Sequence, residues 1–193
     1  ERTAVVDCGG SAQRNAGDLC ADYLGTFGRS RVDLLVLTHF HADHANGVLE
    51  LLARVKVDVL AVPDVERDDP LRRELFSAAE ESGTQIWLIR DDETVDLGPT
   101  RLTLYAPLGA GEANEEGLSL LCETGRFSAL LTGDMGADVE ARLVKYGALP
   151  EVDLLLAGHH GSQNAASQLL LDTVEPSLAA VSVGDNSYGH PAP

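Results

Sequence analysis

The sequence predicts an α/β protein, and three observations support this prediction. In the first half of the chain, continuous apolar runs alternate with amphipathic segments, which is the pattern of buried parallel strands joined by helices. After residue 97 the pattern changes to short strands joined by glycine-containing turns, which is typical of antiparallel sheet. All six histidines lie in three segments that each directly follow a predicted strand, so we expect polar side chains to gather at the strand ends.

Length and composition fit one compact domain. The chain has 193 residues, enough to bury a sizeable core, and it is 44% hydrophobic and 5% aromatic with 19 glycines, as expected for a globular α/β protein. It contains no apolar run near the length of a membrane span and no signal-like N-terminus. We therefore expect residues 1–193 to form a single soluble, monomeric domain.

The net charge of −17 constrains the function. A domain that binds nucleic acid through its own surface is normally basic, so this charge argues against non-specific DNA binding. It argues less strongly against a nuclease, because acidic ligands gather around cations and a bound metal pair reverses the local field.

The cysteines favour a structural role. Cys8, Cys20 and Cys122 are odd in number and form no C-x-x-C pair, so a zinc knuckle is not expected and at most one internal disulfide is possible. We expect them to be small buried hydrophobic residues.

The expected elements follow from the apolar periodicity. In the first half, the predicted strands are 3–7, 32–37, 57–62 and 84–89, and the predicted helices are 18–28, 45–55 and 71–82. The acidic run 91–93 is expected to be a solvated turn. In the second half, the predicted strands are 101–106, 118–123, 127–132, 152–157 and 178–183, and the predicted helices are 137–145 and 169–174.

A histidine-rich loop follows the strand 32–37. It reads His39-x-His41-x-Asp43-His44, and imidazole is the commonest metal ligand near neutral pH. A carboxylate two positions after the second histidine allows the same loop to face two cations. The alternative is a solvated loop that happens to be rich in histidine.

Two further histidine segments and several polar residues belong to the same prediction. The six histidines are His39, His41, His44, His159, His160 and His190, and we expect them to converge on one site. Asp7 ends the first strand and either orients the histidine loop or is an ordinary turn residue. Ser162 either contacts a phosphate or caps the following helix.

These motifs resemble those of the metallo-β-lactamase superfamily along almost the whole chain. The resemblance rests on the histidine loop, the strand-end Asp7, the segment Thr132-Gly133-Asp134 and the segment Gly158-His159. It implies an αββα sandwich with mixed sheets and a two-metal site at the sheet edges. The implied ligands are His39 and His41 for one metal, Asp43 and His44 for the second, Asp134 as the bridging carboxylate, and His159 as the remaining ligand of the second metal.

A narrower resemblance adds a substrate. The histidine loop, the segment Gly158-His159-His160-Gly161-Ser162 and the ending Tyr188-Gly189-His190-Pro191 are similar to the C-terminal domain of ComEC-type competence proteins. Those are membrane channels for incoming DNA. The resemblance implies a nuclease domain on the extracytoplasmic side of the membrane that degrades the non-transported strand, with single-stranded DNA as substrate and the rest of the channel protein as partner.

The chain departs from the family pattern at three points. The third motif reads Asn114-Glu115-Glu116-Gly117-Leu118-Ser119 and lacks the usual histidine, so oxygen ligands such as Asn114 or Glu116 shift the preference from Zn²⁺ toward Mn²⁺ or Mg²⁺, with Mn²⁺ slightly ahead. Gln163 stands where the family often has a phosphate-binding lysine. Outer strands are missing at both ends, so we expect a truncated piece, excised from a larger membrane protein.

The implied chemistry is two-metal phosphodiester hydrolysis. Asp43 and Asp134 hold the metal pair, and His160 or His190, whichever is not a ligand, stabilises the transition state or protonates the leaving group. The alternatives are a hydrolase of the same fold that cleaves a small lactone, thioester or phosphate ester, and a non-catalytic module with a vestigial metal site.

Overall fold

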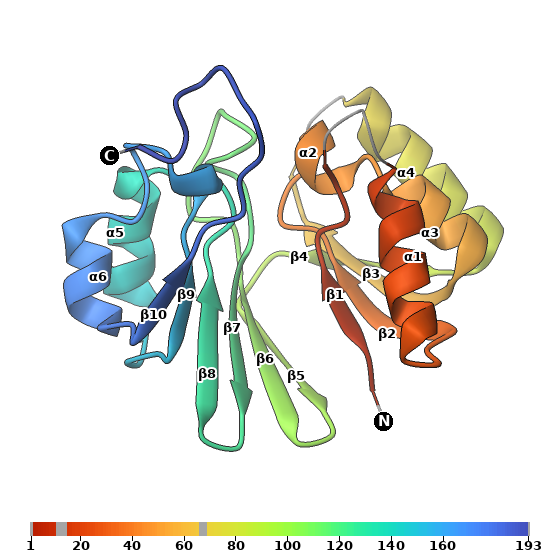
Figure 1. The fold of residues 1–193 in the computed structure, drawn as a ribbon, viewed down its shortest axis with the longest axis horizontal. Coiled ribbons are helices and arrows are strands. Elements are labelled where there is room, and N and C mark those ends of the chain that lie inside the picture. Colours follow the sequence, from red (N-terminus) through yellow and green to blue (C-terminus); the bar gives the residue numbers. More distant parts are fainter. Residues whose placement is uncertain (1, 11–14, 66–68, 193) are drawn as a thin grey trace. The chain divides into compact units, whose positions relative to one another are not determined.

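The computed structural model describes residues 2–10, 15–65 and 69–192. The chain divides into two compact units, a first unit that ends at Ile89 and a second unit that begins at Arg90 (Figure 1). Among the described residues, no helix is both long enough and apolar enough to cross a bilayer. The α/β fold class predicted from the sequence is confirmed.

The first unit contains a four-stranded parallel sheet. Its strands are β1 (Ala4–Val6), β2 (Arg31–Val36), β3 (Lys56–Pro63) and β4 (Gln85–Ile89), in the order β1-β2-β3-β4. The apolar runs predicted these strands because both faces of β2 and β3 are largely buried. Helices cover one face of this sheet (Figure 1), and they are α1 (Ala16–Thr26), α3 (Val48–Arg54) and α4 (Pro70–Ser82).

Local signals fix the helix ends in this unit. The Asn15 side chain caps α1 by accepting from the backbone N–H groups of Gly17 and Asp18. Asp69 caps α4 in the same way, and Gly83 ends α4 in the left-handed conformation with φ 72°.

The helix predicted over residues 45–55 is not continuous in the structure. Two short helices stand there, α2 (Ala42–Ala45) and α3, with Gly47 between them. The N–H of Gly47 donates to the carbonyl of Cys8 at 2.8 Å instead of continuing a helix. This hydrogen bond to the segment after β1 separates α2 from α3.

The second unit contains a six-stranded mixed sheet in the order β10-β9-β8-β7-β6-β5. Its antiparallel strands are β5 (Glu93–Leu97), β6 (Thr100–Tyr105), β7 (Ser119–Thr124) and β8 (Phe127–Leu131). The short strands β9 (Leu154–Leu156) and β10 (Leu178–Ala180) continue the sheet parallel to β8. The helices α5 (Ala137–Tyr146) and α6 (Gln168–Val174) pack on this sheet, with Leu130, Leu143 and Leu155 among the buried residues between them.

Strand β5 was not predicted. It begins at Glu93, inside the run that was expected to be a solvated turn, and its residues alternate between exposed and partly buried positions. An edge strand of this kind buries little apolar surface, so its sequence carries only a weak strand pattern.

Parallel strands bring the polar segments of each unit to one sheet edge. In the first unit, Asp7 follows β1 and the histidine loop follows its parallel neighbour β2. In the second unit, Asp134, the pair His159-His160 and the segment 181–190 follow β8, β9 and β10, which are parallel to one another. Each unit therefore carries its own set of candidate ligands at the carboxyl ends of its strands.

The cysteines provide a test of the packing of the first unit. Cys8 is buried, Cys20 on α1 is partly buried, and both belong to the same hydrophobic cluster without a disulfide. A hydrogen bond from the Cys8 thiol lowers the pKa of Cys20 to about 7, whereas the same contact and burial raise the pKa of Cys8.

We therefore predict that iodoacetamide alkylates Cys20 first, with a rate that is half-maximal near pH 7, because the thiolate is the nucleophile. Cys8→Ala removes the hydrogen-bond donor and should move that midpoint up toward the ordinary thiol value of 9.0. Mass spectrometry of the labelled peptides provides the measurement. Equal labelling of Cys8 and Cys20 at pH 7 would contradict the prediction.

Candidate metal centre

The histidine loop of the first unit brings three imidazole rings together. His39 and His44 are buried, whereas His41 and Asp43 are exposed. The ring centroid of His39 lies 4.7 Å from that of His41 and 4.2 Å from that of His44. Asp43 and His44 offer ligand atoms within 4.8 Å of each other.

The Asp7 carboxylate holds this loop by three hydrogen bonds. Its Oδ1 accepts from the backbone N–H of Thr38 at 2.7 Å, and its Oδ2 accepts from the Thr38 hydroxyl at 2.8 Å. The same Oδ2 lies 2.8 Å from Nδ1 of His44. A carboxylate accepts, so Nδ1 of His44 carries the proton and Nε2 is left as the ligand atom.

Thr38 orients the second buried histidine. Its hydroxyl donates to Asp7 and so can accept from Nδ1 of His39, which lies 3.2 Å away. This arrangement again leaves Nε2 as the ligand atom of His39. Sequence reasoning missed Thr38; its position between the apolar strand and the first histidine was the available signal.

The backbone after β1 runs along the backbone of the histidine loop. The N–H of Cys8 donates to the carbonyl of His44 at 2.8 Å, and the Asn46 side chain bonds both the N–H and the carbonyl of Gly10. A Cβ added to Gly9 would lie 2.4 Å from backbone atoms of Asp43 and His44. The close approach therefore requires glycine at position 9.

In the second unit, Asp134 and His160 lie side by side. Asp134 is 5% exposed, and its Oδ2 lies 3.7 Å from Nε2 of His160. The other ring nitrogen of His160, Nδ1, is 2.8 Å from the carbonyl oxygen of Ser182 and donates to it. The Ser182 carbonyl thus turns Nε2 of His160 toward the carboxylate.

The two adjacent histidines have different neighbours in the structure. The ring of His159 lies 5.6 Å from that of His190 and 6.5 Å from that of His160, measured between centroids. His159 and His160 both have positive φ, at 48° and 53°, a conformation that is uncommon for residues other than glycine. The resemblance implied His159 as the ligand near Asp134, whereas the structure brings His160 to that carboxylate.

The segment before the cis peptide bond His190-Pro191 is held by Asn186. The Asn186 oxygen accepts from the N–H groups of Tyr188 and His190, and its amide group donates to the carbonyl of His190. The Tyr188 ring stacks on that of His190 with centroids 6.1 Å apart. Asn186 was not predicted as a site residue, although its place in the turn before His190 was a usable signal.

Glu140 positions the loop that follows His160. This glutamate of α5 is fully buried, and its two carboxylate oxygens accept from the N–H groups of Ala166 and Ser167 at 2.7 Å each. Sequence reasoning missed it, although an acid on the apolar face of a predicted helix was a signal. Ser167, and not Ser162, caps the last helix, while the Ser162 hydroxyl accepts from the N–H of Asn164.

Two buried oxygens in the second unit lack a hydrogen-bond partner among the described residues. They are Oδ1 of Asn114 and Oγ1 of Thr132, two residues before Asp134. Glu116 differs, because its Oε1 accepts from the N–H of Gly111 within its own turn. Asn114 and Glu116 were the two oxygen ligands expected at the third motif. Of these, Asn114 has the buried oxygen without a hydrogen-bond partner among the described residues, and such an oxygen fits a cation ligand.

The donor set of each unit suits divalent metal ions. Both units present imidazole nitrogens with defined tautomers next to a carboxylate, which is the ligand chemistry of zinc, manganese and iron sites. The α/β fold places these candidate ligands at the carboxyl ends of parallel strands, which is where metal-dependent enzymes of this architecture bind their ligands.

The family follows from comparison with known proteins. The sequence model described as "Metallo-beta-lactamase superfamily" matches residues 1–184, and the chain therefore belongs to this superfamily. The resemblance inferred from the motifs is thus confirmed. Membership supports a hydrolase that binds divalent metal, without specifying the substrate or the metal.

The curated relatives are competence proteins. The chain is 29% identical over 88% of its length to ComE operon protein 3 of Bacillus subtilis, and 31% identical over 79% to Recombination protein 2 of Haemophilus influenzae. It is 27% identical over 87% of its length to Competence protein ComA of Neisseria gonorrhoeae. The chain spans only 22%, 18% and 22% of the length of these three relatives.

Solved structures share the fold. CmlA, a diiron beta-hydroxylase from Streptomyces venezuelae, superposes with a TM-score of 0.55 at 17% identity, covering 84% of this chain and 40% of that one. Human tRNase Z, short form, superposes with a TM-score of 0.54 at 14% identity, covering 91% of this chain and 79% of that one. At such identities the likeness concerns the fold alone.

We predict that Asp7→Asn weakens metal binding by about 10- to 100-fold, because an amide has one accepting oxygen and cannot accept both from the Thr38 N–H at Oδ1 and from the Thr38 hydroxyl and His44 at Oδ2. Isothermal titration with Zn²⁺ or Mn²⁺ measures the affinity. The matched control is Asp58→Asn, which removes a carboxylate that pairs with Arg31 on the same sheet and should leave the affinity unchanged. Equal affinities of the Asp7 and Asp58 variants would refute the positioning role of Asp7.

We also predict that Gly9→Ala lowers the free energy of unfolding by about 1–3 kcal/mol, because the added methyl group overlaps the backbone of the histidine loop. Urea denaturation measures this change. Gly25→Ala is the control, since nothing lies within 4 Å of its added Cβ and alanine favours the helix. A Gly9 variant as stable as the control would show that the loop does not need this close approach.

Proposed function

We propose that this chain is a metal-dependent phosphodiesterase that cleaves DNA during DNA uptake. The observation that carries the proposal is the match to three competence proteins over most of the chain, in a member of a metallo-hydrolase superfamily. The ligand sets at the sheet edge of each unit support it, because a phosphodiester needs positive charge at the reacting phosphate.

We propose that the ligand set of each unit binds divalent metal ions. The first unit contributes His39, His41, Asp43 and His44, and the second unit contributes Asp134 and His160. The ring that lies beside Asp134 is that of His160, so His160 takes the ligand role that the resemblance gave to His159. Asn114 completes the set in place of the missing third-motif histidine.

The residues around the ligands have distinct tasks. When bound, the metal ions neutralise phosphate charge and lower the pKa of water. Asp7 and Thr38 fix the tautomers of His44 and His39, so that their Nε2 atoms are available for binding. His190, which Asn186 holds and which lies next to His159, donates a proton to the leaving oxygen.

The biological setting is part of the proposal. We infer that the chain is one domain of a longer membrane protein, that it lies on the extracytoplasmic side, and that it acts on single-stranded DNA as a monomer. The support is the match to less than a quarter of each competence protein. The strand that is not transported would be its substrate.

Manganese is the metal we propose. The buried, unpartnered Oδ1 of Asn114 offers an oxygen where the family pattern has an imidazole nitrogen, and oxygen ligands shift preference from Zn²⁺ toward Mn²⁺ or Mg²⁺. Elemental analysis of protein purified without added metal tests this assignment. A stoichiometric zinc content with no manganese would refute it.

The test of the function is cleavage of a fluorescent single-stranded oligonucleotide and of a plasmid by the purified chain in Mn²⁺, Mg²⁺ or Zn²⁺. We expect chelation by EDTA to abolish cleavage, and His39→Ala and Asp134→Ala to lower kcat by at least about 10³-fold, because each removes a direct metal ligand.

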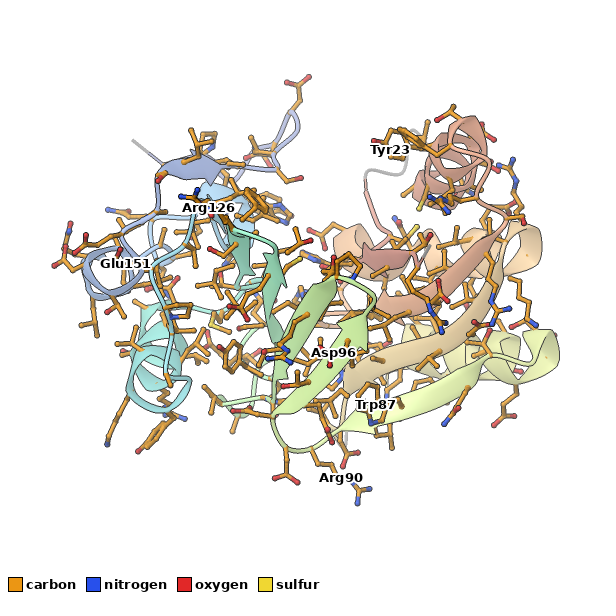
Figure 2. All side chains as sticks on the ribbon, turned by 90° about the horizontal axis from the view of Figure 1, so that it is seen from below. Tyr23, Trp87, Arg90, Asp96, Arg126 and Glu151 are labelled. Atoms are coloured by element: carbon orange, nitrogen blue, oxygen red, sulfur yellow. The ribbon has the colours of Figure 1, made fainter. Side chains whose placement is uncertain are left out.

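The control is Asp96→Ala at a residue labelled in Figure 2. It removes an exposed carboxylate of the second unit that pairs with Arg101, and it should leave cleavage unchanged. Circular dichroism of each variant verifies folding. Bound metal without DNA cleavage in any of the three ions would reject the nuclease. Hydrolysis of a lactone, a thioester or a phosphate monoester would then identify a small-molecule hydrolase, and no hydrolysis a non-catalytic metal module.

A further inference from the structure

Arg72 differs from the arginines of this chain that bind aspartates. Arginines that bind aspartates include Arg2, Arg31, Arg54 and Arg101. Arg72 has no such carboxylate, and its partly enclosed side chain has a buried Nε without a hydrogen-bond partner among the described residues. In a chain with 31 acidic and 14 basic residues, a guanidinium without an acidic partner is unexpected.

Two aromatic rings support the guanidinium. Its central carbon lies 4.4 Å from the ring centroid of Phe76 and 5.8 Å from that of Phe40. The two rings meet edge to face with centroids 6.3 Å apart. Stacking of this kind holds the planar group by cation–π attraction and leaves its edge N–H donors unused.

The position of Arg72 relates it to the candidate metal centre. Phe40 is buried and stands between His39 and His41 in the histidine loop. Arg72 lies in the first turn of α4, which starts after the carboxyl end of β3, and β3 is the parallel neighbour of β2. Arg72 therefore lies at the sheet edge that carries the histidine loop, and it contacts that loop through the Phe40 ring.

The chemistry of the group fits a phosphate. A guanidinium offers two parallel N–H donors that match two oxygens of a phosphodiester, and it stays charged at any relevant pH. A chain with a net charge of −17 needs fixed positive charge where it holds a polyanion. The metal ions provide this charge at the reacting phosphate only.

We propose that Arg72 binds a backbone phosphate of the DNA next to the one that is cleaved, and so sets the affinity for polynucleotide substrates. This inference rests on the proposed function, which supplies the substrate class. Arg72 contacts the substrate by ionic hydrogen bonds, while Phe40 and Phe76 hold it in place.

The test compares Arg72→Met with Arg126→Met in the full chain. Methionine keeps an unbranched stem of similar length and removes the charge. Arg126, which is exposed in the turn between β7 and β8 and labelled in Figure 2, controls for the change in net charge. The readouts are kcat and KM for a single-stranded oligonucleotide, the dependence of KM on salt, and hydrolysis of bis(p-nitrophenyl) phosphate, a small diester with no second phosphate.

We expect Arg72→Met to raise KM for the oligonucleotide by about 10-fold, with little change in kcat, and to reduce the slope of log KM against log salt concentration by about 0.7. Hydrolysis of the small diester should be unchanged. Arg72→Lys should restore part of the affinity, because lysine keeps the charge but not the paired donors. Arg126→Met should match the wild type.

Two outcomes would overturn the inference while leaving the nuclease in place. One is an Arg72→Met variant whose KM and salt slope equal those of Arg126→Met. The other is an equal loss of activity toward the oligonucleotide and the small diester with a lowered melting temperature, which would give Arg72 a purely structural role. Failure of the wild type to cleave the oligonucleotide rejects the proposed function itself, and the inference with it.

Discussion

The Asp7 carboxylate is the constraint on which the histidine loop depends. It sits at the end of β1 with φ 56°, a left-handed conformation that aspartate tolerates better than most residues. From there it accepts hydrogen bonds from the backbone N–H and the hydroxyl of Thr38, and from Nδ1 of His44. One side chain thus fixes the exit of β2, the tautomer of one candidate ligand directly, and that of His39 through Thr38. Because β1 and β2 are parallel neighbours, these contacts form without a long connection.

The second unit reaches a similar result with different groups. A backbone carbonyl, that of Ser182, takes the part that Asp7 plays in the first unit and turns Nε2 of His160 toward Asp134. The carboxylate of Glu140 holds the backbone of the following loop, so the left-handed residues 159–161 are framed by fixed neighbours. Backbone strain of this kind persists where surrounding contacts determine it, and it is commonly found at functional sites.

The sequence predicted the strands better than the contacts between them. Continuous apolar runs located β2 and β3, and the spacing of the histidine loop located a metal-binding motif, because both signals are local. Asp7 had two equal interpretations, since its partners lie 31 and 37 residues away and only the register of β1 on β2 joins them. The distinction between His159 and His160 depended on a carbonyl 22 residues away. Local patterns carry no information about such contacts, and the weakly apolar β5 was missed for a related reason.

The ion pairs of the structure show where this acidic chain uses its positive charge. Part of the positive charge is paired with carboxylates within the protein, as when Arg54 binds Asp18 and Asp22 on the surface of the first unit. Such exposed pairs contribute about 0–1 kcal/mol each to stability, but they remove arginines from the set that could attract a polyanion. A nuclease built this way would rely on cations placed at the reacting phosphate and beside it. Arg72 stacks on two aromatic rings and has no carboxylate partner within residues 2–10, 15–65 and 69–192, so its charge is available for such a contact. A net charge of −17 is therefore compatible both with weak non-specific binding of DNA and with binding of DNA at the proposed site.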